Sequence, residues 1–239
     1  MCADYADRLE YPITSGYIQV VAAGNTIPAF WAHPDAGGTY PGLVVIHDHG
    51  GLTASIRRLV RRLAERGHYV IAPDLSAQSS PAAPDDLKLP AIAAAINALR
   101  THNHCNGDIA IIGFGTGGTL ALQTAAQRDD LKAAVAFNGS PEPFLPLLAA
   151  TTTPILAFYG GQDAAIPAPA IAELKTRLAA ASAAHEVVVY AEAGRDFFDD
   201  ALPGYAADAA ADANRHMLQF LDAHLTDPSH PPDIRHRHF

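Results

Sequence analysis

The chain has 239 residues, enough for one large α/β domain with a sizeable core. Its formal net charge of −9 argues against nucleic acid or an anionic membrane as a partner, because both require a positively charged face. No apolar run approaches the roughly 20 residues that span a bilayer. The N-terminal residues lack the basic and apolar regions of a secretory signal, so we expect a cytoplasmic protein.

The predicted elements begin with an antiparallel hairpin and continue with alternating strands and helices. Residues 17–21 and 26–32 alternate in polarity around a turn at Ala23-Gly24-Asn25, which predicts the hairpin. From residue 42, apolar runs typical of buried parallel strands alternate with helical periodicity. The expected parallel strands are 43–46, 68–72, the run ending at 112, 131–138, 154–159 and 185–190. The expected helices are 56–66, two segments ending near 100 and 128, 167–181 and 206–225.

This pattern predicts an open, doubly wound, mostly parallel sheet of about seven or eight strands. We expect residues 1–225 to form a single domain and the Pro- and His-rich residues 226–239 to form a frayed tail. The arginines of the first helix, Arg57, Arg58, Arg61 and Arg62, are expected to face solvent, opposite the apolar stripe. In such sheets ligands bind beyond the carboxyl ends of the strands, so the loops at that edge are the informative ones.

A glycine-rich turn joins the third of these parallel strands to the next helix. Gly113, Gly115 and Gly118 match G-x-G-x-x-G, which in dinucleotide-binding folds lets a pyrophosphate approach a helix N-terminus. That site also needs an acidic residue at the end of the following strand, and Ala136-Phe137-Asn138 has none. Gly113 and Gly117 also match the nucleophile turn G-x-S-x-G, but the central residue has no side chain. We therefore expect no NAD, FAD or other cofactor.

Five segments, in the order and spacing of the family, resemble the dienelactone hydrolase family of α/β-hydrolases. They cover nearly the whole chain from about residue 14 to 225. The segments are Val45-Ile46-His47-Asp48, Ala72-Pro73-Asp74-Leu75, the run from Asn106 to Gly118, the run from Tyr159 to Pro167 and the run from Tyr190 to Phe197. The resemblance implies an α/β-hydrolase fold and an acyl transfer in which a thiolate attacks an ester or lactone, histidine moves the proton and aspartate orients the histidine.

The residues implied for that triad depart from the family at two of three positions. Gly115 stands at the nucleophile position and cannot attack a carbonyl carbon. Arg195 stands at the histidine position, and a guanidinium cannot accept a proton near neutral pH. Asp163 matches the triad acid, and we expect it to pair with Arg195. The resemblance therefore implies a degenerate catalytic triad.

The positions implied for ligand binding also differ from the family. Asp48 matches a glutamate that lies near the resting thiol, and Gln78 and Asp199 stand where two arginines clamp the substrate carboxylate. Of the family's catalytic features, only the oxyanion hole can persist, because it is formed by backbone N–H groups and does not depend on side chains. The resemblance implies that these groups belong to Thr116 and His49. A Gly-for-nucleophile exchange also removes backbone strain at the turn.

Two functions remain open. The first is a pseudoenzyme that binds a small organic acid beside Arg195 and Thr116 without cleaving it. The second is an enzyme on the same scaffold, either an ester or enol-lactone hydrolase with relocated catalytic groups or another reaction built from Asp48, His49, Asp163 and Arg195. His47 and His49 would share one face of an extended segment, but they lack a third ligand, so we expect no metal. The oligomeric state is left open by the sequence.

Overall fold

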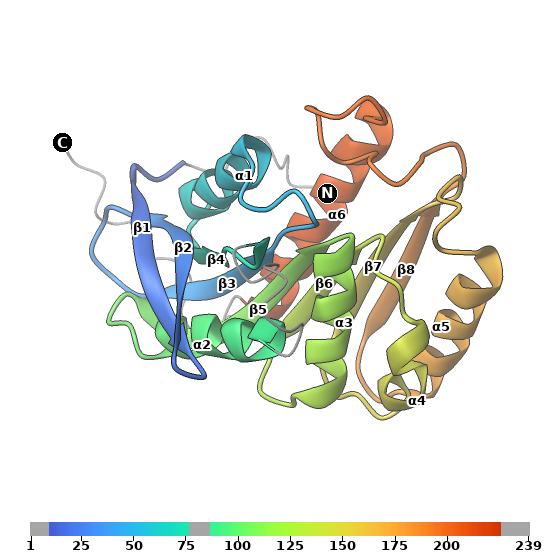
Figure 1. The fold of residues 1–239 in the computed structure, drawn as a ribbon, viewed down its shortest axis with the longest axis horizontal. Helices are drawn as coiled ribbons and strands as arrows, with labels where there is room; N and C mark the ends of the chain where they lie inside the picture. The colour runs from blue at the N-terminus through green and yellow to red at the C-terminus, as the bar shows by residue number, and fades with distance from the viewer. Residues whose placement is uncertain (1–9, 77–86, 226–239) are drawn as a thin grey trace, which may run out of the picture.

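The computed structural model describes residues 10–76 and 87–225, in which eight strands form one sheet (Figure 1). The strands are β1 (Ile13–Ala22), β2 (Asn25–Pro34), β3 (Tyr40–Ile46), β4 (Tyr69–Pro73), β5 (Cys105–Phe114), β6 (Ala133–Phe137), β7 (Ile155–Gly160) and β8 (His185–Tyr190). The helices are α1 (Ala54–Glu65), α2 (Lys88–Arg100), α3 (Thr116–Gln127), α4 (Leu145–Leu148), α5 (Ala168–Ala180) and α6 (Ala207–Leu225), with a 3-10 turn at Glu142–Phe144. The predicted tail 226–239 lies outside the described residues.

The strand order is β1-β2-β4-β3-β5-β6-β7-β8. Strands β1 and β2 pair antiparallel, β2 pairs antiparallel with β4, and β3 to β8 are parallel. This confirms the predicted fold, including the antiparallel hairpin at the N-terminal edge. The chain winds outward from β3 to β4 on one side and from β5 to β8 on the other. The crevice beyond the carboxyl ends of β3 and β5 is therefore the place where this topology binds ligands.

The parallel strands are buried on both faces because helices cover both faces (Figure 1). Successive residues of β3 alternate between two hydrophobic clusters: Val44 and Ile46 belong to one, Leu43 and Val45 to the other. Helices α2, α3 and α5 contribute to the first cluster, and α1 and α6 to the second. The second face matters for function, since α1 and α6 enclose the site described below.

The predicted elements agree with the structure to within a few residues, apart from one short helical segment. The segment 142–148, which contains Pro143 and Pro146 and to which no element was assigned from the sequence, forms the 3-10 turn and α4. Both prolines lie in the first turn of their helices, where a missing N–H costs no hydrogen bond. Among the described residues, no helix combines the length and the apolar character needed to cross a bilayer.

Candidate functional site

The turn between β5 and α3 is a sharp one centred on Gly115. Its backbone angles, φ 52° and ψ −115°, lie outside the regions that residues with side chains adopt easily. The flanking glycines allow close packing, since a Cβ on Gly117 would lie 2.6 Å from the His47 carbonyl oxygen at the end of β3. The glycine-rich turn therefore brings the N-terminus of α3 directly against the residues that follow β3.

The carboxylate of Asp48 fills the space beside Gly115. A Cβ built on Gly115 would lie 2.7 Å from Asp48 Oδ1 and closer still to Oδ2. Asp48 Oδ1 accepts hydrogen bonds from the Thr116 amide at 2.9 Å and from the Thr116 hydroxyl at 2.8 Å. A carboxylate thus occupies the N-terminus of α3, where the helix dipole favours negative charge.

Competing effects act on the pKa of Asp48. Burial raises it, whereas hydrogen bonds from the Thr116 amide and hydroxyl and from the His49 amide, together with the charge of Arg195, lower it. The stabilising contacts outweigh the burial, so the pKa of Asp48 lies below its usual range. Asp48 is ionised at neutral pH, and both amides expected to form an oxyanion hole act on its carboxylate.

Arg195 faces two carboxylates in this site. One guanidinium nitrogen lies 3.3 Å from Asp48 Oδ2, and another lies 3.8 Å from Asp163 Oδ2. The expected proximity of Arg195 and Asp163 is confirmed, although Asp48 is the closer partner. Asp163 Oδ1 accepts from the Ala165 amide at 2.9 Å, while Oδ2 is buried and has no hydrogen-bond partner in the described part of the chain.

Asn138 positions the loop that carries Arg195, a role that was not predicted from the sequence. Its Nδ2 donates to the Arg195 carbonyl oxygen at 2.6 Å, and its Oδ1 accepts from the Gly160 amide at 2.8 Å. Its backbone is left-handed, with φ 48°. An Asn-Gly pair directly after a buried strand was the available signal, because asparagine tolerates this conformation and bonds to nearby backbone.

His47 and His49 do not share a face, contrary to expectation. His47 is buried, accepts from the Leu75 amide at Nε2 (2.9 Å) and donates from Nδ1 to the Asp48 carbonyl oxygen (2.6 Å). His49 is exposed and places Nε2 2.7 Å from the Thr116 hydroxyl oxygen. Their side chains diverge because hydrogen bonds to different loops hold them. No cluster of metal-ligating side chains occurs within residues 10–76 and 87–225.

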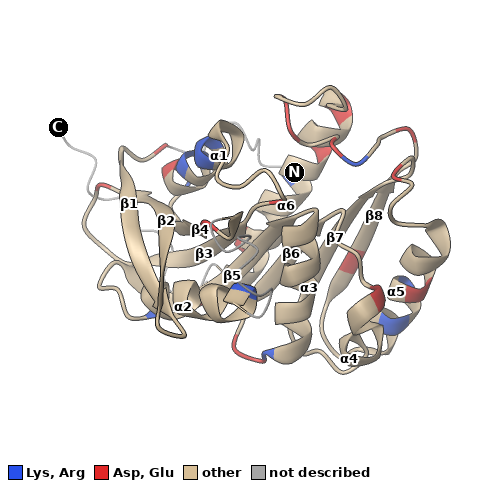
Figure 2. Ribbon diagram, viewed as in Figure 1, with Lys and Arg blue, Asp and Glu red and all other residues tan. Residues whose placement is uncertain are grey.

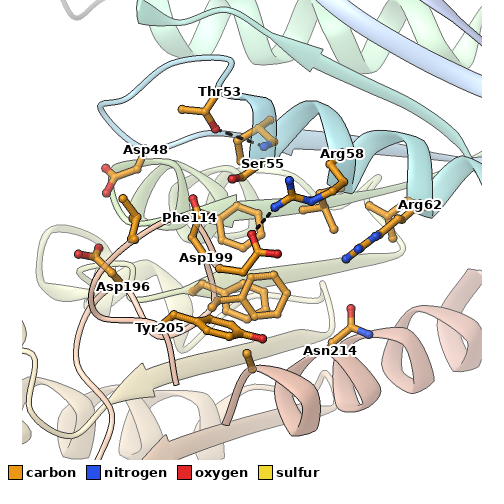
Figure 3. A pocket seen from close by; sticks show the side chains of 18 of the residues that line it. Asp48, Thr53, Ser55, Arg58, Arg62, Phe114, Asp196, Asp199, Tyr205 and Asn214 are labelled. Carbon is orange, nitrogen blue, oxygen red and sulfur yellow. Dashed lines mark hydrogen bonds and ion pairs between the residues drawn. The ribbon is translucent and has the colours of Figure 1, made fainter. Parts of the chain in front are cut away.

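A cavity of about 680 Å³ opens beside Gly115, between α1 and the segment leading into α6 (Figure 3). Asp48, Arg195 and Asp199 line it, whereas Gln78 lies outside the described residues. The binding roles expected for Asp48, His49, Thr116, Gln78 and Asp199 stay predictions.

Two of the arginines of α1 that were expected to face solvent line this cavity. Arg58 forms an ion pair with Asp200 across it, and Arg62 lies one turn further along the helix (Figure 3). Side chains one turn apart share a helix face, so α1 presents this pair to the cavity. Arg61 instead lies over the Phe30 ring at 4.9 Å. Arg62 is exposed, as expected, and the side chain of Arg58 is 42% exposed. The periodicity of α1 alone does not reveal that a cavity lies against this part of the helix.

Comparison with known proteins agrees with the fold. The family model described as "Dienelactone hydrolase family" matches residues 27–225. The chain is 32% identical over 252 residues to "Putative carboxymethylenebutenolidase" of Yersinia pestis, covering 93% of this chain and 94% of that protein. It is 30% identical over 218 residues to "Carboxymethylenebutenolidase" of Pseudomonas putida, covering 83% and 92%.

A solved structure gives the same result. The crystal structure named "Putative Dienelactone Hydrolase" from Klebsiella pneumoniae matches with a TM-score of 0.80 and 29% identity. The match covers 87% of this chain and 98% of that one. The chain described here therefore belongs to the dienelactone hydrolase family, with an α/β-hydrolase fold.

Proposed function

We propose that this chain is a ligand-binding member of its family that lacks the covalent ester and lactone hydrolysis suggested by the names of its relatives. Gly115 and Arg195 occupy the nucleophile and base positions in this proposal, and the ligand is a small organic acid. The carrying observation is the Asp48 carboxylate, which lies in the space that a side chain on Gly115 would need.

Each requirement of the covalent mechanism is unmet in this proposal. Attack needs a side chain at the turn, and Gly115 has none. Proton transfer needs a base, and Arg195 stays protonated. Stabilising the oxyanion needs free N–H groups, yet the Thr116 amide donates to Asp48 at 2.9 Å. Proteases stripped of their triad keep about 10³–10⁴-fold catalysis through such donors and substrate binding. With the donor occupied, even that residual route is closed.

Turnover of activated substrates tests the proposal. We expect 4-nitrophenyl acetate and an enol-lactone to be hydrolysed no faster with the native chain than with an equal amount of denatured protein in the same buffer. The comparison variant is Gly115→Cys/Arg195→His/Asp48→Ala, since clearing Asp48 makes room for the new side chain. Native turnover well above buffer, or labelling of the native cavity by a cysteine- or serine-directed reagent, would contradict the proposal.

A second candidate function, hydrolysis by Thr116 with His49 as base, is favoured by their 2.7 Å contact. However, Thr116 Oγ1 donates its single proton to Asp48 Oδ1 at 2.8 Å, so His49 serves as the donor in this arrangement. A fluorophosphonate label on Thr116, abolished by Thr116→Val and by His49→Gln, would establish the second function over the first.

A further inference from the structure

We propose that the cavity beside Gly115 binds an elongated aryl-substituted carboxylic acid, with its ring against Phe114 and Phe198 and its carboxylate at Arg62. The inference rests on the proposed function, because it concerns a ligand that is held and not cleaved. It moves the anion from Arg195, where the sequence suggested it, to a different element.

The end of the cavity next to Gly115 is aromatic. Phe114 is the last residue of β5 and stacks on Phe137 at 4.7 Å between ring centroids. Phe198 lies 5.5 Å from Phe114 and 4.4 Å from Phe137, and all three rings line the cavity. Tyr205 lines it from the segment before α6 (Figure 3). Such a wall favours a ring, which packs against aromatic faces and edges at these separations.

The opposite end is bordered by Arg62 of α1 and Asn214 of α6 (Figure 3). Arg62 lies eight residues beyond Ala54, about 12 Å along the helix. The guanidinium of Arg62 forms no ion pair or hydrogen bond with any described residue, whereas that of its neighbour Arg58 is paired with Asp200. A guanidinium and a side-chain amide at one end of an apolar cavity can both donate to a carboxylate.

The distribution of charge sets the direction of the ligand. Most of the charged residues of α1 are basic, whereas most of those in the loop that leads into α6 and in the first turn of α6 are acidic (Figure 2). Asp48 and Asp196 lie at the end opposite Arg62 (Figure 3). Arg195 also lines the cavity, but its guanidinium is already paired with Asp48 and Asp163. Glu10 and Glu65 also line the cavity, but neither forms an ion pair with Arg62. The carboxylate of the ligand therefore binds at Arg62 and not beside Gly115, because the Asp48 carboxylate already occupies the N-terminus of α3.

Calorimetric titration with 6-phenylhexanoate tests this assignment on the full chain. The neutral control ligand is 6-phenylhexan-1-ol, and benzoate is the control too short to reach from the aromatic wall to Arg62. We expect the long acid to bind at least tenfold more tightly than either control. Arg62→Gln should remove the advantage of the acid over the alcohol. The matched control is Arg61→Gln, which makes the same change of charge one residue away, outside the cavity.

Three results would overturn the inference: no binding of 6-phenylhexanoate, equal affinity for acid and alcohol, or the same loss in Arg61→Gln as in Arg62→Gln. Both positions are on the surface of α1, so neither variant should unfold the chain. Ester turnover by the native protein would refute the proposed function alone, because binding of the acid at Arg62 is measured separately. Failure of the titration would likewise leave the absence of turnover untouched.

Discussion

The guanidinium of Arg195 lies 3.3 Å from the Asp48 carboxylate, although 147 positions separate the two residues. The same guanidinium faces Asp163, whose side chain is only 4% exposed. Arg195 is thus the cation that compensates a buried carboxylate and a half-buried one. Replacing Arg195 should therefore lower the free energy of unfolding more than replacing a surface arginine does.

Replacing Arg195 with glutamine should lower the free energy of unfolding by about 1–3 kcal/mol, because Asp163 would remain buried without a countercharge. Adding Asp163→Asn should recover much of that loss, since the uncompensated charge disappears. Urea denaturation at pH 7 measures both. The control is Arg58→Gln, which breaks a partly exposed ion pair and should cost no more than about 1 kcal/mol. Equal losses in the two single variants would contradict the assigned role of Arg195.

Replacing Gly115 with serine should lower the free energy of unfolding by roughly 1 kcal/mol or more. The structure supplies two reasons: a positive φ of 52° and the overlap of any Cβ with the Asp48 carboxylate. Gly107→Ala isolates the backbone contribution, because Gly107 has φ 92° and nothing within 4 Å of a Cβ. In an Asp48→Ala background the cost of Gly115→Ser should fall. An unchanged denaturation midpoint in Gly115→Ser would show that this turn is not strained.

Asn138 should be intolerant of replacement because two hydrogen bonds and a left-handed backbone depend on it. Asn138→Ala should cost about 2 kcal/mol or more, since it loses both bonds and is strained at φ 48°. Asn138→Gly should cost less, because glycine adopts the backbone freely. Thermal denaturation distinguishes the two variants. A glycine variant less stable than the alanine variant would argue against backbone strain at this position.

Stability should fall in mild acid because of His102. Its ring lies 5.6 Å from that of His104 and 6.4 Å from that of His33, with Tyr69 at 4.7 Å. Burial, followed by the charges of His104 and His33, lowers the pKa of His102. The unfolded chain therefore takes up a proton first, and stability drops as pH falls below about 6.5 toward the lower pKa of the folded state.

The measurement is the melting temperature between pH 7.5 and 5. We expect His102→Asn to flatten the decline over that range. His185→Asn serves as the matched control, since His185 is exposed and its ring nitrogen lies 3.4 Å from the Ala183 carbonyl oxygen. A decline that is identical in all three proteins would remove His102 as its cause.

Much of the fold was accessible from local pattern. The hairpin, the parallel strands and the long helices follow from hydrophobic periodicity, and the turn at Gly115 follows from glycine spacing, because these signals act over a few residues. Hydrophobic periodicity did not predict the short helical segment 142–148, because its α-helical part is only 4 residues long. The cavity beside Arg58 and Arg62 was not predicted because helix periodicity shows which side of a helix faces the core but not what lies beyond its other side.

The sequence by itself determined the order of the elements, the family and the identity of the residues at each strand end, since all of these reside in local composition and spacing. Only the tertiary structure decided that the Asp48 carboxylate lies in the space beside Gly115. It also decided that this carboxylate accepts a hydrogen bond from the Thr116 amide and that Arg195 lies beside it. The physical reason is distance along the chain. These contacts join residues 68 and 147 positions apart, and their geometry depends on how β3, β5 and the loop after β8 meet at one edge of the sheet.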